Sequence, residues 1–311
     1  MKNPDQLSGA SRTSAPSAHN AIRNATLIGL TAIVFWSATV GLVRSIAEAL
    51  GPAGGAASFF SVAALLTCAV LGIPRLRHFS WRYLLIGGLL FVSYEVFLAL
   101  SLGMAHSRAE AMELGMINYL WPCLTIVLAV LTGQQRSSML LWPGAALSLL
   151  GIVWVLKGDS AWSPALLWDH MQGNPVAYLL AFSAAALWAA YSVFTRRYGG
   201  GKSAVPLFLL MTALVLWIKY GYSAEAPLHF SWSSALQVLV LGGLSATAYS
   251  CWNVGIQHGN MTLLAAASYF TPIFSVLLAS LWLQTQPTLS FWQGVLMVTL
   301  GSLICWRSTR R

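Results

Sequence analysis

The feature that most constrains this chain is an uncharged stretch, residues 226–306, which contains no Asp, Glu, Lys or Arg. A helix of ~20 apolar residues crosses a bilayer core about 30 Å thick. The stretch is therefore long enough for three spans joined by tight turns at residues 257–260 and 284–287. Over the whole chain 8% of the residues are charged and 57% are hydrophobic, whereas a soluble domain carries about 25% charged residues. This composition excludes a soluble globule and predicts a multi-span membrane protein.

The same length criterion places ten spans along the chain. Breaks between them are supplied by glycine and proline, for example at Pro74, Gly133 and Pro175. Residues 1–23, which are rich in Ser, Ala, Asn and Pro, are expected to form a disordered tail before the first span, and residues 307–311 a short second tail. The predicted spans are 25–46, 54–72, 82–105, 110–132, 138–156, 175–197, 203–222, 233–256, 261–284 and 289–306.

The basic residues are distributed unequally between the two sides of the membrane. With the N-terminus inside the cell, 13 of the 17 Lys and Arg residues fall on the inner side and 4 on the outer side. Cytoplasmic loops carry the excess of Lys and Arg in membrane proteins. We therefore expect both termini to be cytoplasmic, and we attribute the net charge of +9 to membrane orientation rather than to a nucleic-acid partner.

Two segments 150 residues apart repeat one another, because 118–122 reads N-Y-L-W-P and 268–272 reads S-Y-F-T-P. The same offset carries Trp142, Gly144 and Gly151 onto Trp292, Gly294 and Gly301. Five spans per half is an odd number, so the second half would enter the membrane from the opposite face. The predicted fold is an all-α integral membrane protein with ten transmembrane helices, arranged as two inverted five-helix repeats around a central cavity. The first repeat is 24–157, an external linker is 158–174, and the second repeat is 175–306.

Matched prolines interrupt one span in each half. Pro122 and Pro272 each remove a backbone donor and free a carbonyl on the preceding turn. In lipid, such freed groups must face protein or a water-filled cavity. These positions predict two broken helices that line a substrate site.

Glu95 is the only acidic residue near the middle of a predicted span. An ionised, unpaired carboxylate at bilayer depth is unfavourable by several kcal/mol or more. Glu95 is therefore a candidate for handling substrate or protons. The alternative is a protonated acid that forms a hydrogen bond with a neighbouring helix.

Aromatic and amide side chains deep in the spans are the remaining candidates. Their polar atoms need partners or water at that depth, so a central aromatic-lined cavity would account for them together, although packing is the alternative for each one. Asn118 and Asn253 need hydrogen-bond partners either across a helix pair or on a substrate. The deep aromatic residues are Trp36, Tyr94, Tyr119, Trp121, Trp188, Tyr191, Tyr249, Trp252 and Tyr269.

Several function classes lack their sequence signals. The four cysteines have no paired spacing and are expected to be small buried hydrophobes, so no metal or redox cofactor is predicted. A phosphate-cradling glycine loop and a Gly-x-Ser-x-Gly elbow are both absent, which disfavours an ATP-driven pump and an esterase-type enzyme. A membrane-embedded enzyme would need clustered His, Asp or Glu, and these residues are spread over both sides. The expected partners are a small-molecule substrate and lipid.

The segments Trp36-Ser37, Tyr94-Glu95 and 112–122, together with the ten short spans and basic inner loops, resemble the drug/metabolite transporter superfamily in its ten-span EamA-type branch, over about residues 24–306. The resemblance implies export of aromatic and other neutral amino acids across a bacterial cytoplasmic membrane by alternating access. A multidrug exporter that recognises cations through Glu95 is the alternative within the superfamily. The cavity lining implied by the resemblance is Trp36, Tyr94, Glu95, Asn118, Tyr119, Trp121, Trp188, Tyr191, Tyr249, Trp252, Asn253 and Tyr269.

Overall fold

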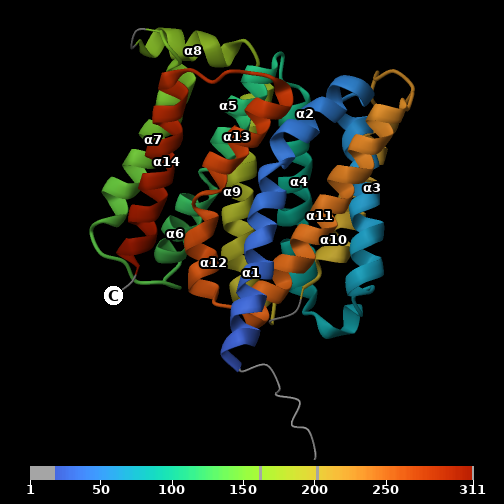
Figure 1. The fold of residues 1–311 in the computed structure, drawn as a ribbon, viewed down its shortest axis with the longest axis vertical. Helices are drawn as coiled ribbons and strands as arrows, with labels where there is room; N and C mark the ends of the chain where they lie inside the picture. The colour runs from blue at the N-terminus through green and yellow to red at the C-terminus, as the bar shows by residue number, and fades with distance from the viewer. Residues whose placement is uncertain (1–17, 161–162, 201–202, 310–311) are drawn as a thin grey trace, which may run out of the picture.

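The computed structural model describes residues 18–160, 163–200 and 203–309, and all the regular secondary structure in these residues is helical (Figure 1). A 3-10 turn, η1 (Leu76–His78), and a π-helical turn, η2 (Tyr83–Gly87), precede α4. The α-helices are α1 (Ala18–Ser37), α2 (Thr39–Leu50), α3 (Pro52–Leu71), α4 (Gly88–Gly103), α5 (Arg108–Asn118), α6 (Trp121–Leu131), α7 (Leu141–Lys157), α8 (Pro164–Gln172), α9 (Pro175–Tyr198), α10 (Val205–Gly221), α11 (Trp232–His258), α12 (Met261–Ser268), α13 (Thr271–Leu283) and α14 (Leu289–Ser308).

The prediction of an all-helical membrane protein is confirmed. Among the described residues, seven helical stretches are long and apolar enough to cross a bilayer, and α7, α10 and α13 are shorter apolar helices. One boundary of the predicted domain plan differs in the structure: residues 18–23, predicted as part of the tail, are the first residues of α1. The external linker at residues 158–174 stays a prediction; it contains a short helix, α8, which lies across one end of the bundle (Figure 1). Residues 1–17 of the predicted tail are outside the described residues.

The first predicted span is divided at Ala38, a break that the sequence did not indicate. The Ser37 hydroxyl donates to the Ile33 carbonyl oxygen at 2.7 Å, and the Ala38 amide donates to Phe35 rather than continuing the α-helical pattern. Side-chain hydrogen bonds of this kind compete with helix propagation and bend helices. The bend places Trp36 of α1 and Thr39 of α2 beside the central cavity described below.

The two proline motifs lie where helices are interrupted. Pro122 is the second residue of α6 and Pro272 the second residue of α13, each after a two-residue gap. Pro272 leaves the Ser268 carbonyl without its helical donor, and the Thr271 hydroxyl donates to that oxygen at 2.6 Å. Position 121, which matches Thr271, is tryptophan and has no hydroxyl to supply. The two breaks therefore share a position but differ in how the freed backbone is satisfied.

Glycines allow the closest helix pair, α7 and α14, to meet backbone to backbone. A Cβ added at Gly151 would lie 2.8 Å from the Gly294 carbonyl oxygen, and one added at Gly294 would lie 2.6 Å from that of Gly151. Gly144 and Gly301 face each other in the same way, about two helical turns away. Small residues that permit such approach are a common basis of helix association in lipid.

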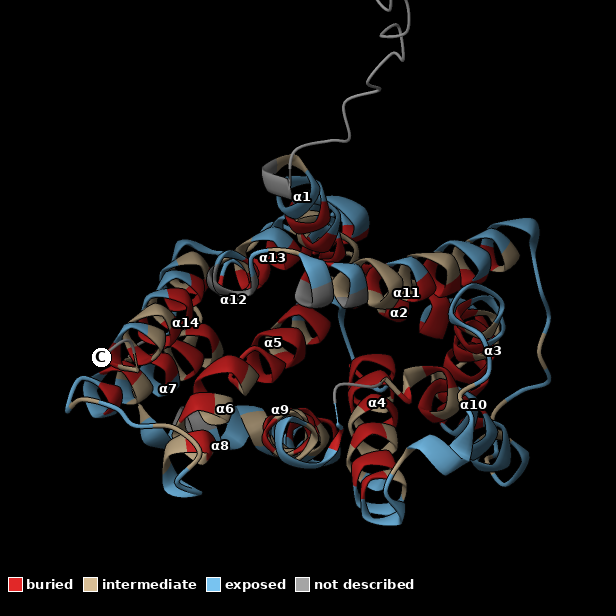
Figure 2. Cartoon of the chain, turned by 90° about the horizontal axis from the view of Figure 1, so that it is seen from below, coloured by how far each residue is buried: buried red, intermediate tan, exposed pale blue. Residues whose placement is uncertain are grey.

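The remaining helices pack in pairs around the centre of the bundle. α1 packs against α11, α4 against α9, and α3 against α10. Viewed along the bundle, the α7–α14 pair and the α3–α10 pair lie at opposite ends of an elongated ring, with buried faces turned inward and exposed faces outward (Figure 2). α5 and α6 together, and α12 and α13 together, complete the walls of the ring.

Candidate functional site

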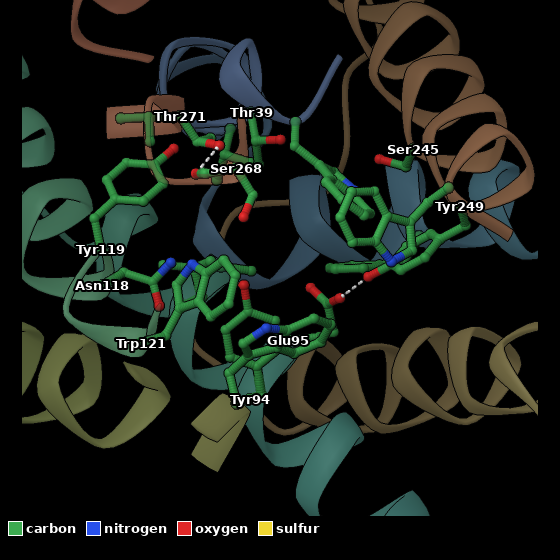
Figure 3. Close-up of a pocket in the computed structure, with 18 of the residues that line it drawn as sticks. Thr39, Tyr94, Glu95, Asn118, Tyr119, Trp121, Ser245, Tyr249, Ser268 and Thr271 are labelled. Carbon is green, nitrogen blue, oxygen red and sulfur yellow. Dashed lines mark hydrogen bonds between the residues drawn. The ribbon is translucent and has the colours of Figure 1, made fainter. Parts of the chain in front are cut away.

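A cavity of about 230 Å³ lies within the ring, between the α1–α6 side of the chain and the α9–α13 side (Figure 3). The structure brings together nine of the twelve predicted site residues on its wall. These are Trp36, Tyr94, Glu95, Asn118, Tyr119, Trp121, Trp188, Tyr249 and Trp252. The clustering follows from the helix packing, because α1, α4, the α5–α6 break, α9 and α11 all turn a face toward the same space.

Aromatic rings on the wall contact one another in two groups. Trp36 of α1 lies 5.5 Å from Tyr249 and 5.3 Å from Trp252, both of α11, measured between ring centroids. Trp188 of α9 lies 4.5 Å from Tyr94 of α4 and 6.3 Å from Trp121 of α6. Edge-to-face and tilted ring pairs of this kind hold each other in place. The cavity therefore presents a pre-arranged surface on which a planar ring can stack.

Glu95 lies on the cavity wall and joins two elements of different halves. The Tyr249 hydroxyl of α11 donates a hydrogen bond of 2.6 Å to Glu95 Oε1 of α4 (Figure 3). Glu95 is 9% exposed, and the described lining residues include neither lysine nor arginine. A carboxyl group in such a place is stable as the neutral acid or when a cationic group of a ligand lies beside it.

Asn118, the last residue of α5, supplies an unoccupied acceptor. Its side-chain oxygen Oδ1 is buried and accepts no hydrogen bond within the described structure, and the residue as a whole is 5% exposed. A buried polar atom without a partner is unfavourable by about 1–3 kcal/mol. Because Asn118 lines the cavity, an N–H donor on a bound molecule would satisfy this oxygen.

Three predicted site residues do not contribute to the described wall. Tyr191 packs behind it, 5.3 Å from Phe91 and 5.3 Å from Trp188 between ring centroids. Tyr269 turns toward Trp306, 6.2 Å away, in a small cluster with Cys123. Both residues face other helices rather than the cavity. Asn253 belongs to α11, but its side chain lies outside what the structure describes.

Sequence reasoning missed the hydroxyl-bearing, aliphatic and phenylalanine residues of the wall. Ser268 and Thr271 flank the second helix break, so the repeat motif itself could have identified them. The others carry no signal that separates them from ordinary residues of an apolar helix. The missed lining residues are Thr39, Val40, Val43, Phe59, Phe60, Leu98, Ala99, Ser192, Ser245, Ser268 and Thr271.

The structure is a helical membrane bundle in which interrupted helices surround a cavity lined by aromatic residues and a few polar groups. This arrangement is typical of small-molecule membrane transporters. Comparisons with known proteins agree. Residues 175–307 match the family model of the EamA-like transporter family. The chain is 46% identical over 289 residues to the aromatic amino acid exporter YddG of Salmonella typhimurium, and equally so to YddG of Escherichia coli; each match covers 93% of this chain and 99% of the relative.

A more distant relative is the aromatic amino acid exporter YddG of Ancylobacter novellus, which is 31% identical over 266 residues, or 82% of this chain and 87% of the relative. A solved structure described only as "Crystal structure of protein" is similar with a TM-score of 0.66 and 26% identity, and the match covers 93% of this chain and 99% of that one. The chain therefore belongs to the EamA-like transporter family and is a multi-pass membrane protein.

Proposed function

We propose that the chain is a secondary transporter that exports aromatic and other neutral amino acids across the bacterial cytoplasmic membrane by alternating access. The observation that carries this proposal is the central cavity, walled by aromatic rings in edge-to-face and tilted contact and by two polar groups, Glu95 and Asn118, that have bonding capacity left for a ligand. The near-full-length relatives named as aromatic amino acid exporters support the substrate class.

We further propose ten spans in two inverted repeats, with α1–α2, α5–α6 and α12–α13 each counting as one interrupted span. The packing pattern supports this arrangement, because exchanging the halves maps the α1–α11 contact onto α9–α4 and the α3–α11 contact onto α10–α4. The α3–α10 and α7–α14 pairs map onto themselves, as pairs beside a two-fold axis must. The excess of basic residues on the N-terminal side supports cytoplasmic termini.

The size and chemistry of the cavity fit a free amino acid. Ligand pockets usually measure about 300–1,000 Å³, and a cavity of about 230 Å³ suits one small metabolite better than a lipid or a nucleotide-linked sugar. The ring of an aromatic substrate would stack beside Trp188 or Trp36. Its ammonium group would lie near Glu95 or donate to Asn118 Oδ1, and a wall hydroxyl such as that of Thr39 would face its carboxylate.

Flux in vesicles tests the proposal. Purified protein is placed in liposomes loaded with labelled tryptophan, phenylalanine or threonine, with and without a pH gradient, and initial efflux is compared with protein-free liposomes. We expect saturable efflux of at least the aromatic substrates, and competition by the unlabelled amino acid. If efflux of every amino acid tested is no faster than from protein-free liposomes, the assignment of amino acids as substrates is wrong.

A cation exporter is the second candidate, because Glu95 is a buried carboxyl on a wall whose described residues carry no positive charge. The variant Glu95→Gln separates the two candidates. A carrier of neutral amino acids should keep part of its flux, whereas a carrier that recognises cations through this charge should lose it entirely. Efflux of a lipophilic organic cation from the same vesicles gives the direct measurement.

A further inference from the structure

An ion pair at one end of the bundle ties together three helices that wall the cavity. Arg108, the first residue of α5, contacts both carboxylate oxygens of Glu48 near the end of α2, with Nη2–Oε2 at 2.8 Å and Nε–Oε1 at 3.1 Å. Its other terminal nitrogen, Nη1, donates at 3.1 Å to the carbonyl oxygen of Leu283, the last residue of α13. The guanidinium thus joins α2 and α5 of the first half to α13 of the second half, at the α8 end of the bundle (Figure 1).

The end of α13 is shaped to receive this cation. Gln284, which follows Leu283, adopts a left-handed conformation with φ of 52°, the only non-glycine residue with positive φ in the described part of the chain. This residue ends the helix, whose last carbonyl oxygens have no helical donors. A cation beside these carbonyls is favoured by the helix dipole. A second arginine, Arg44, contacts the same Glu48 carboxylate at 3.0 Å.

Below the ion pair, the same three helices are packed without space for water. Gly115 of α5 meets Val40 of α2 so closely that an added Cβ would lie 2.9 Å from the valine methyl carbon. Gly41 of α2 meets Ala279 of α13, with 3.3 Å between an added Cβ and the alanine Cα. We call this contact of α2, α5 and α13 the seam. Val40 and Tyr119 belong both to the seam and to the cavity wall, so the seam lies directly between the cavity and the ion pair.

Within the described residues, the opposite end of the bundle shows no matching closure. Under exchange of the halves, α12 corresponds to α5, yet α5 packs against α2, α7 and α13 as well as α4 and α9, whereas α12 packs chiefly against α1 and α11. The lining side chains follow the same division. Val43 and Phe60, toward the α8 end, are 4% exposed, whereas Trp188 and Ser192, toward the other end, are half-buried.

We propose that the Arg108–Glu48 ion pair, fastened to α13 through the Leu283 carbonyl, is the clasp that holds the seam closed, and that this clasp must release before the cavity can open at the α8 end. The inference rests on the alternating access of the proposed function. In that cycle the clasp shifts the equilibrium toward the state that is closed at the α8 end, because only this state contains these hydrogen bonds.

Cysteine labelling tests the clasp without any substrate. Ser275 on α13 lines the seam and is 1% exposed, and Ser192 on α9 lines the cavity toward the other end. Each is replaced by cysteine in a chain whose four native cysteines are removed. The rate of reaction with a maleimide is then measured in detergent, where the reagent reaches both ends equally.

We expect Arg108→Gln to raise the labelling rate at Ser275→Cys by about two- to fivefold, the range for a partly exposed ion pair, and to leave labelling at Ser192→Cys no faster. Glu48→Gln should also raise the labelling rate. Because the two residues contact each other, the rate increase in the double variant should be smaller than the product of the two single increases. Arg108→Lys, which keeps the charge but not the planar fork, should lie between. Arg77→Gln, an exposed arginine at the opposite end, is the matched control.

Two results would overturn the proposal. One is an Arg108→Gln rate at Ser275→Cys equal to that of the Arg77→Gln control. The other is faster labelling at both positions, which would indicate general loosening of the bundle instead of release at one end. Labelling is independent of flux, so a failed clasp leaves the substrate assignment standing, and an absence of amino acid efflux leaves the clasp measurable.

Discussion

The Tyr249 hydroxyl and the Glu95 carboxylate, 2.6 Å apart, form a hydrogen bond between α11 and α4 on the wall of the cavity. Removing the donor with Tyr249→Phe leaves the buried carboxyl short of a partner while keeping the ring that meets Trp36 edge to face. We expect amino acid flux to fall by up to about tenfold, because a hydrogen bond within a protein contributes about 0.5–1.5 kcal/mol. Initial efflux rates at saturating and at low substrate separate a change in KM from a change in maximal rate. Unchanged rates at both concentrations would show that the pair has no part in transport.

Asn118 offers an acceptor to the ligand, and its loss should weaken binding more than folding. Its Oδ1 has no hydrogen bond within the described structure, so Asn118→Ala removes no bond of this oxygen, and the side chain's one interaction that is lost in the empty protein is that with Tyr94. We expect the KM for amino acids to rise about tenfold while the unfolding temperature stays the same or increases. Efflux kinetics together with a thermal unfolding curve check both parts. A lower unfolding temperature with an unchanged KM would assign Asn118 to folding instead.

Trp188 should decide which substrates are preferred. Its ring contacts both Tyr94 and Trp121, so Trp188→Ala removes a central part of the aromatic wall. Stacking between aromatic groups contributes about 0.5–1.5 kcal/mol beyond burial, so we expect flux of tryptophan to fall several-fold more than flux of threonine. Trp188→Phe keeps a ring and should retain most of the preference. Equal losses for both substrates would contradict a stacking role.

The glycine contact of α7 and α14 gives a prediction on stability with an internal control. A Cβ at Gly301 would lie 2.4 Å from the Ser148 hydroxyl oxygen and 2.6 Å from the Gly144 carbonyl oxygen, whereas one at Gly243 of α11 has nothing within 4 Å. We expect Gly301→Ala to destabilise the protein by about 1–3 kcal/mol, as overpacking does, and Gly243→Ala to be close to neutral. Thermal unfolding in detergent measures both. Equal unfolding temperatures would mean that the two helices separate without penalty.

The parts of the fold that follow backbone rules could be predicted from the sequence. The breaks at Pro122 and Pro272 follow from a missing amide, and the helical stretches follow from apolar length. The break at Ala38 involves neither proline nor glycine. The Ser37 hydroxyl bonds back onto its own helix, but Ser58 and Thr67 make the same bond within the unbroken helix α3, so nothing in the local sequence marks this position.

The candidate site was predictable where an unusual residue lay at depth, as with Glu95 and most of the deep aromatic residues. It was not predictable which face of an apolar helix looks inward, because in lipid both faces are apolar. Tyr191 and Tyr269 were expected on the wall and instead pack against other helices. Thr39 and Ser192, small and unremarkable in sequence, lie on the wall. The ion pair of Arg108 with Glu48 joins residues 60 positions apart, and only the packed structure brings them together.

Where the α7 and α14 backbones meet at Gly151 and Gly294, neither helix can slide or rotate against the other without a collision of main-chain atoms. If the two halves rotate against each other, the α7–α14 contact would therefore be the fixed axis of that rotation. Motion would be smallest there and would grow toward the far side of the ring, where α3 meets α10 through large side chains such as Trp217 and Tyr220.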